Sequence, residues 1–397
     1  MITKDIILNK VQEVNEYVMN TRGFLHTIPE LSGKEYETTK FLQEEVKKLG
    51  LPIEMVTETG FIATLDTGKP GKTIALRADI DGLPLEEDPK NLKGEKKYVS
   101  KIKGAIHACG HDAHMAMLLG TMKVLVSLKE ELTGKVLFCF EDGEEIGWTG
   151  IYPMLDVLST KQVDAVYGTH VTSFMKSGTI SLEPGPRMAG AAVVEIDVLG
   201  KSGHGSRPDL SINPIFAAAQ VLNGIASAWN NQIDVTQTVT LGLAQIHGGT
   251  AINIIPEKVT IGGTLRFFNV EEGAKAVEII KNVATLTAQA HKCEVNLEKT
   301  KVSAYPVIND ENLAKLASEG VSEVLPEGSL VTGIKWFASE SFSEYGKNYP
   351  SVLAFVGIGN EEFGSGAEHH NIHFDVDDNA LETGVAATVK FTVDFLK

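Results

Sequence analysis

The stretch "TIALRADIDGLPL" (residues 73–85) is the part of this chain that best indicates its fold. Its first half is apolar and rich in residues typical of a buried strand, and Asp79 and Asp81 follow directly. In open α/β sheets, functional side chains gather beyond the carboxyl ends of the parallel strands. The stretch therefore predicts an α/β domain with Asp79 and Asp81 at its functional edge, the alternative being a solvated turn.

Strand-like and helix-like segments alternate along the first 180 residues. Strands are expected at 61–65, 73–78, 135–140 and 164–170. Two helices are expected in the first fifty residues. Two more are expected at 112–128 and at 150–158. Because strands separated by helices favour parallel pairing, this order predicts a mixed, mostly parallel sheet flanked by helices.

The pattern changes near residue 187, and a chain of 397 residues is long enough for two domains. From there the order is strand, helix, strand, strand, helix, strand, which is ferredoxin-like. The α/β pattern resumes after residue 300. We therefore expect a discontinuous α/β domain at 1–186 and 301–397, and an inserted ferredoxin-like α+β satellite domain at 187–300.

Composition narrows the class of ligand. The net charge of −16 repels nucleic acid and anionic membrane surfaces, so a small-molecule substrate is expected. The chain has no run of eighteen apolar residues and its N-terminus lacks a signal-peptide core, so a cytoplasmic location is expected. Three widely spaced cysteines, Cys109, Cys139 and Cys293, do not form a disulfide framework.

The stretch "HACGHDAHMA" (107–116) is the first candidate for metal binding. Cys109 and His111 lie just before an expected helix, where a loop can turn both side chains toward one point. A thiolate and an imidazole suit zinc, and also manganese, cobalt or nickel when carboxylates join them. Asp79 and Asp81 are included among the catalytic candidates, because a carboxylate behind a metal-binding imidazole orients it. The alternative is that these residues cap and fill a buried helix.

Further candidates follow other expected strands. Glu144 and Glu145 are adjacent in "FEDGEEIGWTG" (140–150), and such neighbours repel each other unless a cation or a shared proton intervenes. One can bind metal while the other takes a proton from water; a surface acidic loop is the alternative. With His170 and the late "AEHHNIHFD" (367–375), the set can hold two divalent ions.

The expected insert carries three more candidates. His204 lies in the glycine-rich turn "GKSGHGSRPD" (200–209), where its imidazole is accessible. Asn253 and Arg266 could hold a carboxylate, which arginine binds through a fork of donors. The ordinary alternatives are a surface turn for His204 and a structural salt bridge for Arg266.

Together these motifs resemble the dinuclear metallopeptidase and amidohydrolase family of the aminoacylases and carboxypeptidases, especially its N-acyl-amino-acid amidohydrolase branch with the hippurate and auxin-conjugate hydrolases. The resemblance runs from "HTIPELSGKEYET" (26–38) to "HNIHFDVDD" (370–378). It implies a catalytic α/β domain and an inserted lid domain that dimerises. It also implies two divalent metal ions per subunit, which could be manganese, zinc, cobalt or nickel.

The resemblance assigns roles to residues of this sequence. The implied metal ligands are Cys109, His111, Glu145, His170 and His370. Cys109 would bridge the two ions, and the family spacing favours His370 over its neighbours His369 and His373. Glu144 would be the general base, and His204 would stabilise the oxyanion, in many members from the partner subunit. Asn253 and Arg266 match positions that contact substrate.

Two departures from the family pattern bear on the substrate. Glu141 and Asp142 replace a common Gln and Pro, which could tighten cation binding or favour a substrate with a positive group. Asp209 stands where a second histidine is common in the insert, with Arg207 at the variable position.

Three hypotheses follow. The first is hydrolysis of N-acyl amino acids to a carboxylic acid and a free amino acid, with dipeptidase or carboxypeptidase cleavage as a close alternative. The second is a catalytically silent binding protein with a structural metal. The third is a thiol enzyme that uses Cys109, which needs a free thiolate and an orienting group.

Overall fold

The computed structural model describes residues 2–397 and divides into two compact units. Unit 1 contains the segment that ends at Gly185, together with Ile308–Ile334 and Glu344–Lys397. Unit 2 contains Pro186–Val307 and Lys335–Ser343. The domain boundaries given above stay a proposal.

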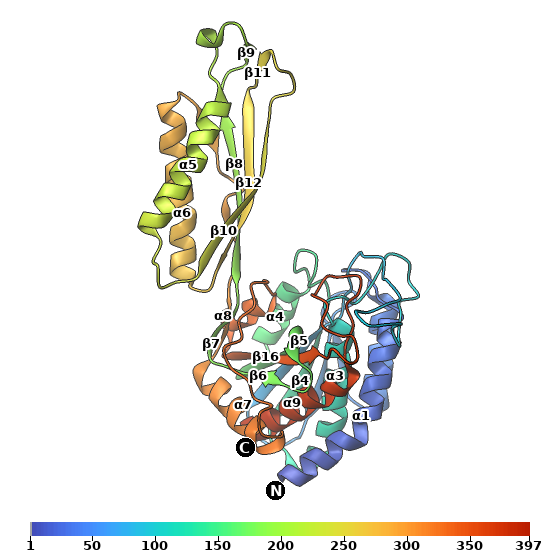
Figure 1. The fold of residues 1–397 in the computed structure, drawn as a ribbon. Coiled ribbons are helices and arrows are strands. Elements are labelled where there is room, and N and C mark those ends of the chain that lie inside the picture. The colour runs from blue at the N-terminus through green and yellow to red at the C-terminus, as the bar shows by residue number, and fades with distance from the viewer. Residues whose placement is uncertain (1) are drawn as a thin grey trace. The chain divides into compact units, whose positions relative to one another are not determined.

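Unit 1 is built around one mixed sheet, seen with its helices in Figure 1. In spatial order its strands are β1 (Ile53–Met55), β2 (Phe61–Asp66), β4 (Lys135–Glu141), β3 (Thr73–Asp79), β5 (Ala165–Lys176), β16 (Ser351–Gly359) and β6 (Ile180–Ser181). The four central strands, β4 to β16, pair in parallel, and antiparallel strands flank them on both sides. The predicted α/β sheet with a parallel centre is confirmed.

Helices cover this sheet. They are α1 (Lys4–His26), α2 (Tyr36–Lys48), α3 (His111–Ser127), α4 (Ile151–Ser159), α7 (Glu311–Val324), α8 (Phe342–Asn348) and α9 (Leu381–Phe395). Helix α3 is apolar on nearly every side, as a helix enclosed by other elements must be. It packs against α1 and α9 and against β3 and β5, so its first turn is held at the edge of the sheet.

The carboxyl ends of β3, β4 and β5 lie at the same edge. Asp79 at the end of β3 stands opposite Glu141 at the end of β4. His170 lies within β5, opposite Phe355 of β16. The loops after these strands therefore converge, as parallel pairing requires.

Unit 2 has an antiparallel sheet with two helices. Its strands in order are β10 (Val239–Gly248), β12 (Lys258–Phe267), β8 (Gly190–Leu199) and β13 (Glu294–Asn296), and β14 (Lys301–Ala304) also pairs with β8. Helices α5 (Pro214–Gln232) and α6 (Val270–Ala290) pack together and against this sheet, where Ile196, Ile261 and Ile280 share one apolar core. Strand β8 lies between β12 and β13, which is the ferredoxin-like arrangement.

Some elements differ from the expectation. Strand β5 extends to Lys176 rather than ending at residue 170, because β16 continues to pair with it as far as Gly359. The last helix begins at Leu381, after a 3-10 turn at Asp378–Ala380. Helix α7, with its apolar face on α9, was not singled out in advance. Within residues 2–397 there is no helix long and apolar enough to cross a bilayer.

We expect Gly110→Ala to destabilise unit 1. Gly110 precedes α3 with φ = 90°, and a Cβ there would overlap the side chain of Val171. The left-handed backbone and the overlap should together cost about 2 kcal/mol or more. Urea unfolding with chelator present measures the change in the free energy of unfolding.

Gly94→Ala is the matched control, because a Cβ at Gly94 meets no atom of the described residues within 4 Å. This variant should stay within about 0.5 kcal/mol of the wild type. Equal stabilities for the two variants would contradict the steric argument.

Candidate active site

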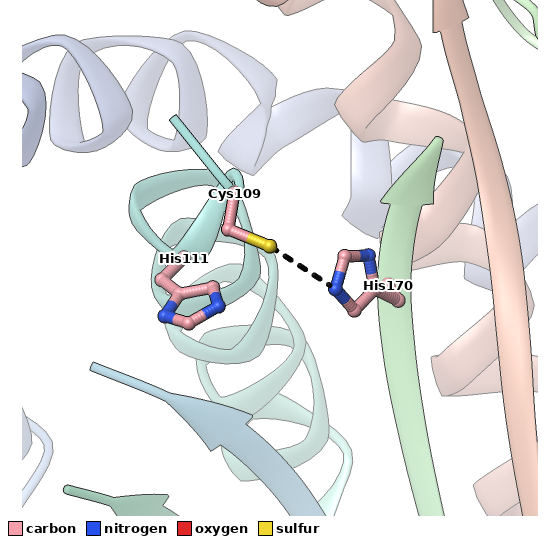
Figure 2. Close-up of side chains that lie close together, drawn as sticks. All are labelled: Cys109, His111 and His170. Carbon is pink, nitrogen blue, oxygen red and sulfur yellow. Dashed lines mark hydrogen bonds between the residues drawn. The ribbon is translucent and has the colours of Figure 1, made fainter. Parts of the chain in front are cut away.

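Potential metal ligands from four parts of unit 1 come together. Cys109, His111 and His170 form one group in which all ligand atoms lie within 4.8 Å of one another. Cys109, Glu145 and His370 form a second such group, and His111, Glu144 and Glu145 a third. Figure 2 shows the first group, with the Cys109 Sγ directed at His170 Nε2, 3.7 Å away. The residues predicted to bind metal are thus clustered, and Glu144 lies among them.

Local structure explains how each residue reaches the cluster. Cys109 and His111 flank the left-handed Gly110 at the start of α3. Glu145 follows β4 after a turn at Gly143, which has φ = 64°. His370 has φ = 60°, and its backbone N–H donates to the carbonyl of Ala108 at 2.9 Å, which fixes the late loop beside α3.

Hydrogen bonds set the tautomer of two histidines. His111 Nδ1 lies 2.9 Å from the Asp81 carbonyl and 3.1 Å from Asp81 Oδ1, so this nitrogen carries the proton. His170 Nδ1 lies 2.7 Å from the carbonyl of Val171 and is protonated for the same reason. Both Nε2 atoms therefore keep a lone pair for a metal ion.

The cluster fits divalent metal ions. His111 Nε2 and Glu145 Oε1 are buried and have no hydrogen-bond partner among residues 2–397. Glu145 Oε1 lies 3.8 Å from His111 Nε2 and 3.4 Å from His370 Nε2. Buried polar atoms that face one another without bonding need a common partner, and a thiolate with imidazoles and carboxylates suits zinc and its neighbours.

The local charges favour a cation. Burial would lower the pKa of His111, but Asp79, Asp81 and Cys109 raise it well above its usual value. Burial and the charge of Glu145 raise the pKa of the Cys109 thiol well above its usual value. A cation placed here would stabilise the thiolate. A free thiolate is disfavoured in this setting, which argues against Cys109 as a nucleophile.

Asp81 is a hydrogen-bond acceptor for the cluster. Besides His111, it accepts hydrogen bonds from the Glu145 backbone N–H at 2.9 Å and from Ser32 Oγ at 2.6 Å. Asp79 is fully buried. Burial would raise its pKa, but Arg77 and two histidines hold that pKa well below its usual value. Both aspartates, included above among the catalytic candidates, therefore contact histidines of the cluster, and their roles stay a prediction.

The two departures at the end of β4, Glu141 and Asp142, are both buried. Glu141 is buried and bound by Arg77 and by the hydroxyl of Tyr345. Asp142 Oδ2 lies 2.8 Å from the hydroxyl of Thr57 and 3.0 Å from that of Thr59. Both carboxylates are buried, and the expectation that they attract a positive group of the substrate stays a prediction.

Neighbouring polar residues are also engaged. His114 Nδ1 lies 2.6 Å from Asp79 Oδ1, so His114 supports the site from behind, as predicted. His369 Nε2 accepts from the Ser173 N–H at 3.2 Å, and burial lowers the pKa of His369 to about 3. His373 Nδ1 lies 2.9 Å from the carbonyl of Lys90. His370 thus remains the member of its loop closest to Glu145.

Arg77 is the functional neighbour that the sequence expectation missed. It joins Asp79 and Glu141 beneath the cluster. A signal was present, because an arginine within a fully apolar strand must find buried carboxylates.

The candidates in unit 2 form two separate places. His204 is exposed in β9 (Gly203–His204), which pairs with β11 (Ile254–Ile255), and the Asn253 carbonyl accepts from the Gly205 N–H at 2.8 Å. Arg266 lies near the far end of β12, where burial lowers the pKa of its guanidinium. The nine residues of β12 from Lys258 to Arg266 span roughly 26 Å. Within one chain, His204 and Asn253 are therefore neighbours, and Arg266 is distant from them.

The exposed Asp209 does not carry a free charge either. Its two carboxylate oxygens accept from Arg207 Nε at 2.9 Å and from Arg207 Nη2 at 2.7 Å. This pair is internal to the turn, and the effect of Asp209 on the choice of substrate stays a prediction.

Known proteins resemble the chain over nearly its whole length. Residues 75–394 match the model of peptidase family M20/M25/M40. The sequence is 35% identical to thermostable carboxypeptidase 2 of Saccharolobus solfataricus, over 98% of this chain and 97% of that protein. It is 34% identical to the N-acyl-L-amino acid amidohydrolase of Geobacillus stearothermophilus, over 83% and 88%.

A solved structure shares the same architecture. A dinuclear metal-binding peptidase of the M20 family from Bacillus subtilis superposes with a TM-score of 0.83 at 29% identity, covering 97% of this chain and 99% of that one. The family model and the relatives each cover well over half of the sequence. The chain therefore belongs to peptidase family M20/M25/M40, as the resemblance implies, and it is a hydrolase.

Proposed function

We propose that this protein hydrolyses the amide bond of N-acyl amino acids and releases a carboxylic acid and a free amino acid. The observation that carries the proposal is the position of Glu144 beside the buried ligand cluster. A general base must lie within reach of the water that attacks the carbonyl. The relative from Geobacillus stearothermophilus, named an N-acyl-L-amino acid amidohydrolase, supports this substrate class.

The proposed ligands of two divalent ions are Cys109, His111, Glu145, His170 and His370. When bound, the ions would polarise the scissile carbonyl and lower the pKa of water. The donor set suits manganese, zinc, cobalt or nickel and does not distinguish among them.

The protein's own residues account for the proton transfers and for orientation. Glu144 would take a proton from the attacking water and deliver one to the leaving amine. Asp81 keeps the Nδ1–H of His111 engaged and fixes the backbone of Glu145, so the ligands are preorganised. His204 would donate a hydrogen bond to the developing oxyanion, and Asn253 and Arg266 would hold the substrate, with Arg266 suited to its carboxylate.

Cleavage of dipeptides or of C-terminal residues is the alternative. The relative named thermostable carboxypeptidase 2 supports it, and a free carboxylate would serve both reactions. The substrate is a small molecule in either case, with nucleic acid and membranes excluded on charge, and the cytoplasmic location stays a prediction.

We further infer that the protein is a homodimer in which His204 serves the partner's site. In support, His204 pairs with Ile254, just before β12 begins at Lys258, whereas Arg266 lies roughly 26 Å further along that strand, too far for both to touch one small substrate. Two copies could supply them to one site. Strand β10 is also an edge of its sheet and is largely exposed, so it is available for pairing with another copy.

Removal of metal should abolish hydrolysis, because the carbonyl and the water lose their activation. Chelated protein would be loaded with manganese, zinc, cobalt or nickel. Amine release would then be measured on N-acetyl amino acids, N-aroyl amino acids and dipeptides. We expect at least one metal to restore hydrolysis of the N-acyl compounds.

Three results would contradict the proposal. Restored cleavage of dipeptides alone would favour the peptidase alternative. Activity that survives chelation would favour a thiol enzyme. Two bound ions without any turnover would favour a silent binding protein.

The Glu144→Gln variant should retain metal and lose turnover. The amide keeps the size of the side chain but cannot accept the proton, which should lower kcat by about 10²–10⁴-fold. Metal content is measured by elemental analysis and kcat with the best substrate. Glu368→Gln, an exposed glutamate of the late loop, is the control and should keep its activity. Near-normal kcat for Glu144→Gln would remove Glu144 from the mechanism.

Mixing two inactive variants tests the shared site. His204→Ala and Glu144→Gln each disable every site in their own homodimers. In mixed dimers, one site would combine an intact Glu144 with the partner's intact histidine. After denaturation and joint refolding, about a quarter of the wild-type activity should return. Failure to recover activity would contradict the shared site. A monomeric mass by light scattering would contradict the dimer.

A further inference from the structure

A buried chain of hydrogen bonds leads from helix α8 toward the ligand cluster. The hydroxyl of Tyr345 donates to Glu141 Oε2 at 2.7 Å. Arg77 donates to the same carboxylate through Nη2 at 2.9 Å and through Nε at 3.2 Å. A third nitrogen, Arg77 Nη1, donates to Asp79 Oδ2 at 2.7 Å. Each of these four residues is at most 2% exposed, so solvent does not screen their charges.

Asp79 connects this chain to the histidines. Its Oδ1 lies 2.6 Å from His114 Nδ1, and its Oδ2 lies 3.5 Å from His111 Nε2. His114 Nε2 accepts from the N–H of Val171 at 2.9 Å, next to His170. The orientation of Asp79 therefore affects two histidines on α3 and the backbone beside His170.

The charge balance of this chain is unequal. One guanidinium, that of Arg77, lies between two carboxylates, those of Glu141 and Asp79. Because Glu141 takes two of the donors, Arg77 is shared between two carboxylates, and the charges of these three groups sum to one net negative charge. If Glu141 were neutral, the whole charge of Arg77 would act on Asp79, and the cluster would attract a cation less strongly.

We propose that Glu141 and Tyr345 are positioning residues for the metal centre. Through Arg77 they set the orientation and effective charge of Asp79, and thereby the affinity of the ligand cluster for divalent cations. The role rests on the proposed metal centre, but not on the identity of the substrate. It gives Glu141, at the end of β4, a function different from contact with substrate.

Metal affinity measured without substrate tests the role. The Glu141→Gln variant removes one charge and nearly preserves shape. Its dissociation constant for cobalt or zinc, obtained by competition with a chromophoric chelator, should rise by about 10–100-fold. Tyr345→Phe removes a single donor, so a smaller rise of about two- to tenfold is expected. The absorption of the cobalt-loaded protein should also change, because it reports the geometry at the Cys109 thiolate.

Tyr167→Phe is the matched control. Tyr167 is equally buried in β5, where it stacks on Phe391, and its hydroxyl has no hydrogen-bond partner among residues 2–397, so it does not join the chain of Tyr345, Glu141 and Arg77. Loss of the Tyr167 hydroxyl should leave the metal dissociation constant unchanged. Thermal unfolding of each metal-free variant identifies the folded protein, and if Glu141→Gln does not fold, the comparison of Tyr345→Phe with Tyr167→Phe decides.

Two results would overturn the role. One is that folded Glu141→Gln and Tyr345→Phe both bind metal as tightly as Tyr167→Phe. The other is that the wild type binds no divalent metal, which would overturn the proposed metal centre as well. Failure to hydrolyse N-acyl amino acids, with metal affinities that follow the expected order, would affect only the proposed substrate.

Discussion

The rest of the site depends on the hydrogen bonds that the Asp81 carboxylate accepts. Asp81 follows β3 directly and accepts hydrogen bonds from His111, from the backbone of Glu145 and from Ser32. These partners belong to the start of α3, the loop after β4 and the loop after α1. A single buried anion thus joins three segments distant in sequence, and two of them carry proposed metal ligands.

Parallel strands made unit 1 largely predictable from its sequence. Polar residues after three separate strands predict one cluster only if those strands are parallel neighbours, and β3, β4 and β5 are. What the sequence could not supply was the direction of individual side chains. Glu141 and Glu144 are three residues apart, yet Glu141 ends β4, where register places it opposite Asp79 and beside Arg77, and Glu144 lies in the loop that follows. A shift of one residue would turn that side chain to the other face of the sheet.

In unit 2 the sequence predicts the elements better than the distances between their residues. His204, Asn253 and Arg266 occur in two short motifs and share a proposed substrate, which suggests that they are neighbours. A strand of ten residues separates them instead, since β12 carries Arg266 away from the turn that holds His204. Spacing along an extended strand converts directly into distance, whereas loops conceal it. The length of β12, which separates Arg266 from His204 within one chain, is also the argument that a second chain supplies one of them to a shared site.

Ordering of the site also explains why so many acidic groups can lie beneath it. Unpaired buried carboxylates would take up protons, and Asp79 avoids this by contact with Arg77 and His114. Arg77 in turn cannot be satisfied by Asp79 alone, since its guanidinium carries five donors and Glu141 receives two of them. Arg77 therefore requires Glu141 as a second acceptor, and Asp79 requires Arg77 to stay charged. The histidines in turn require Asp79 to hold their orientation. These contacts hold the side chains of the ligand cluster in place before a cation binds, so cation binding does not have to order them.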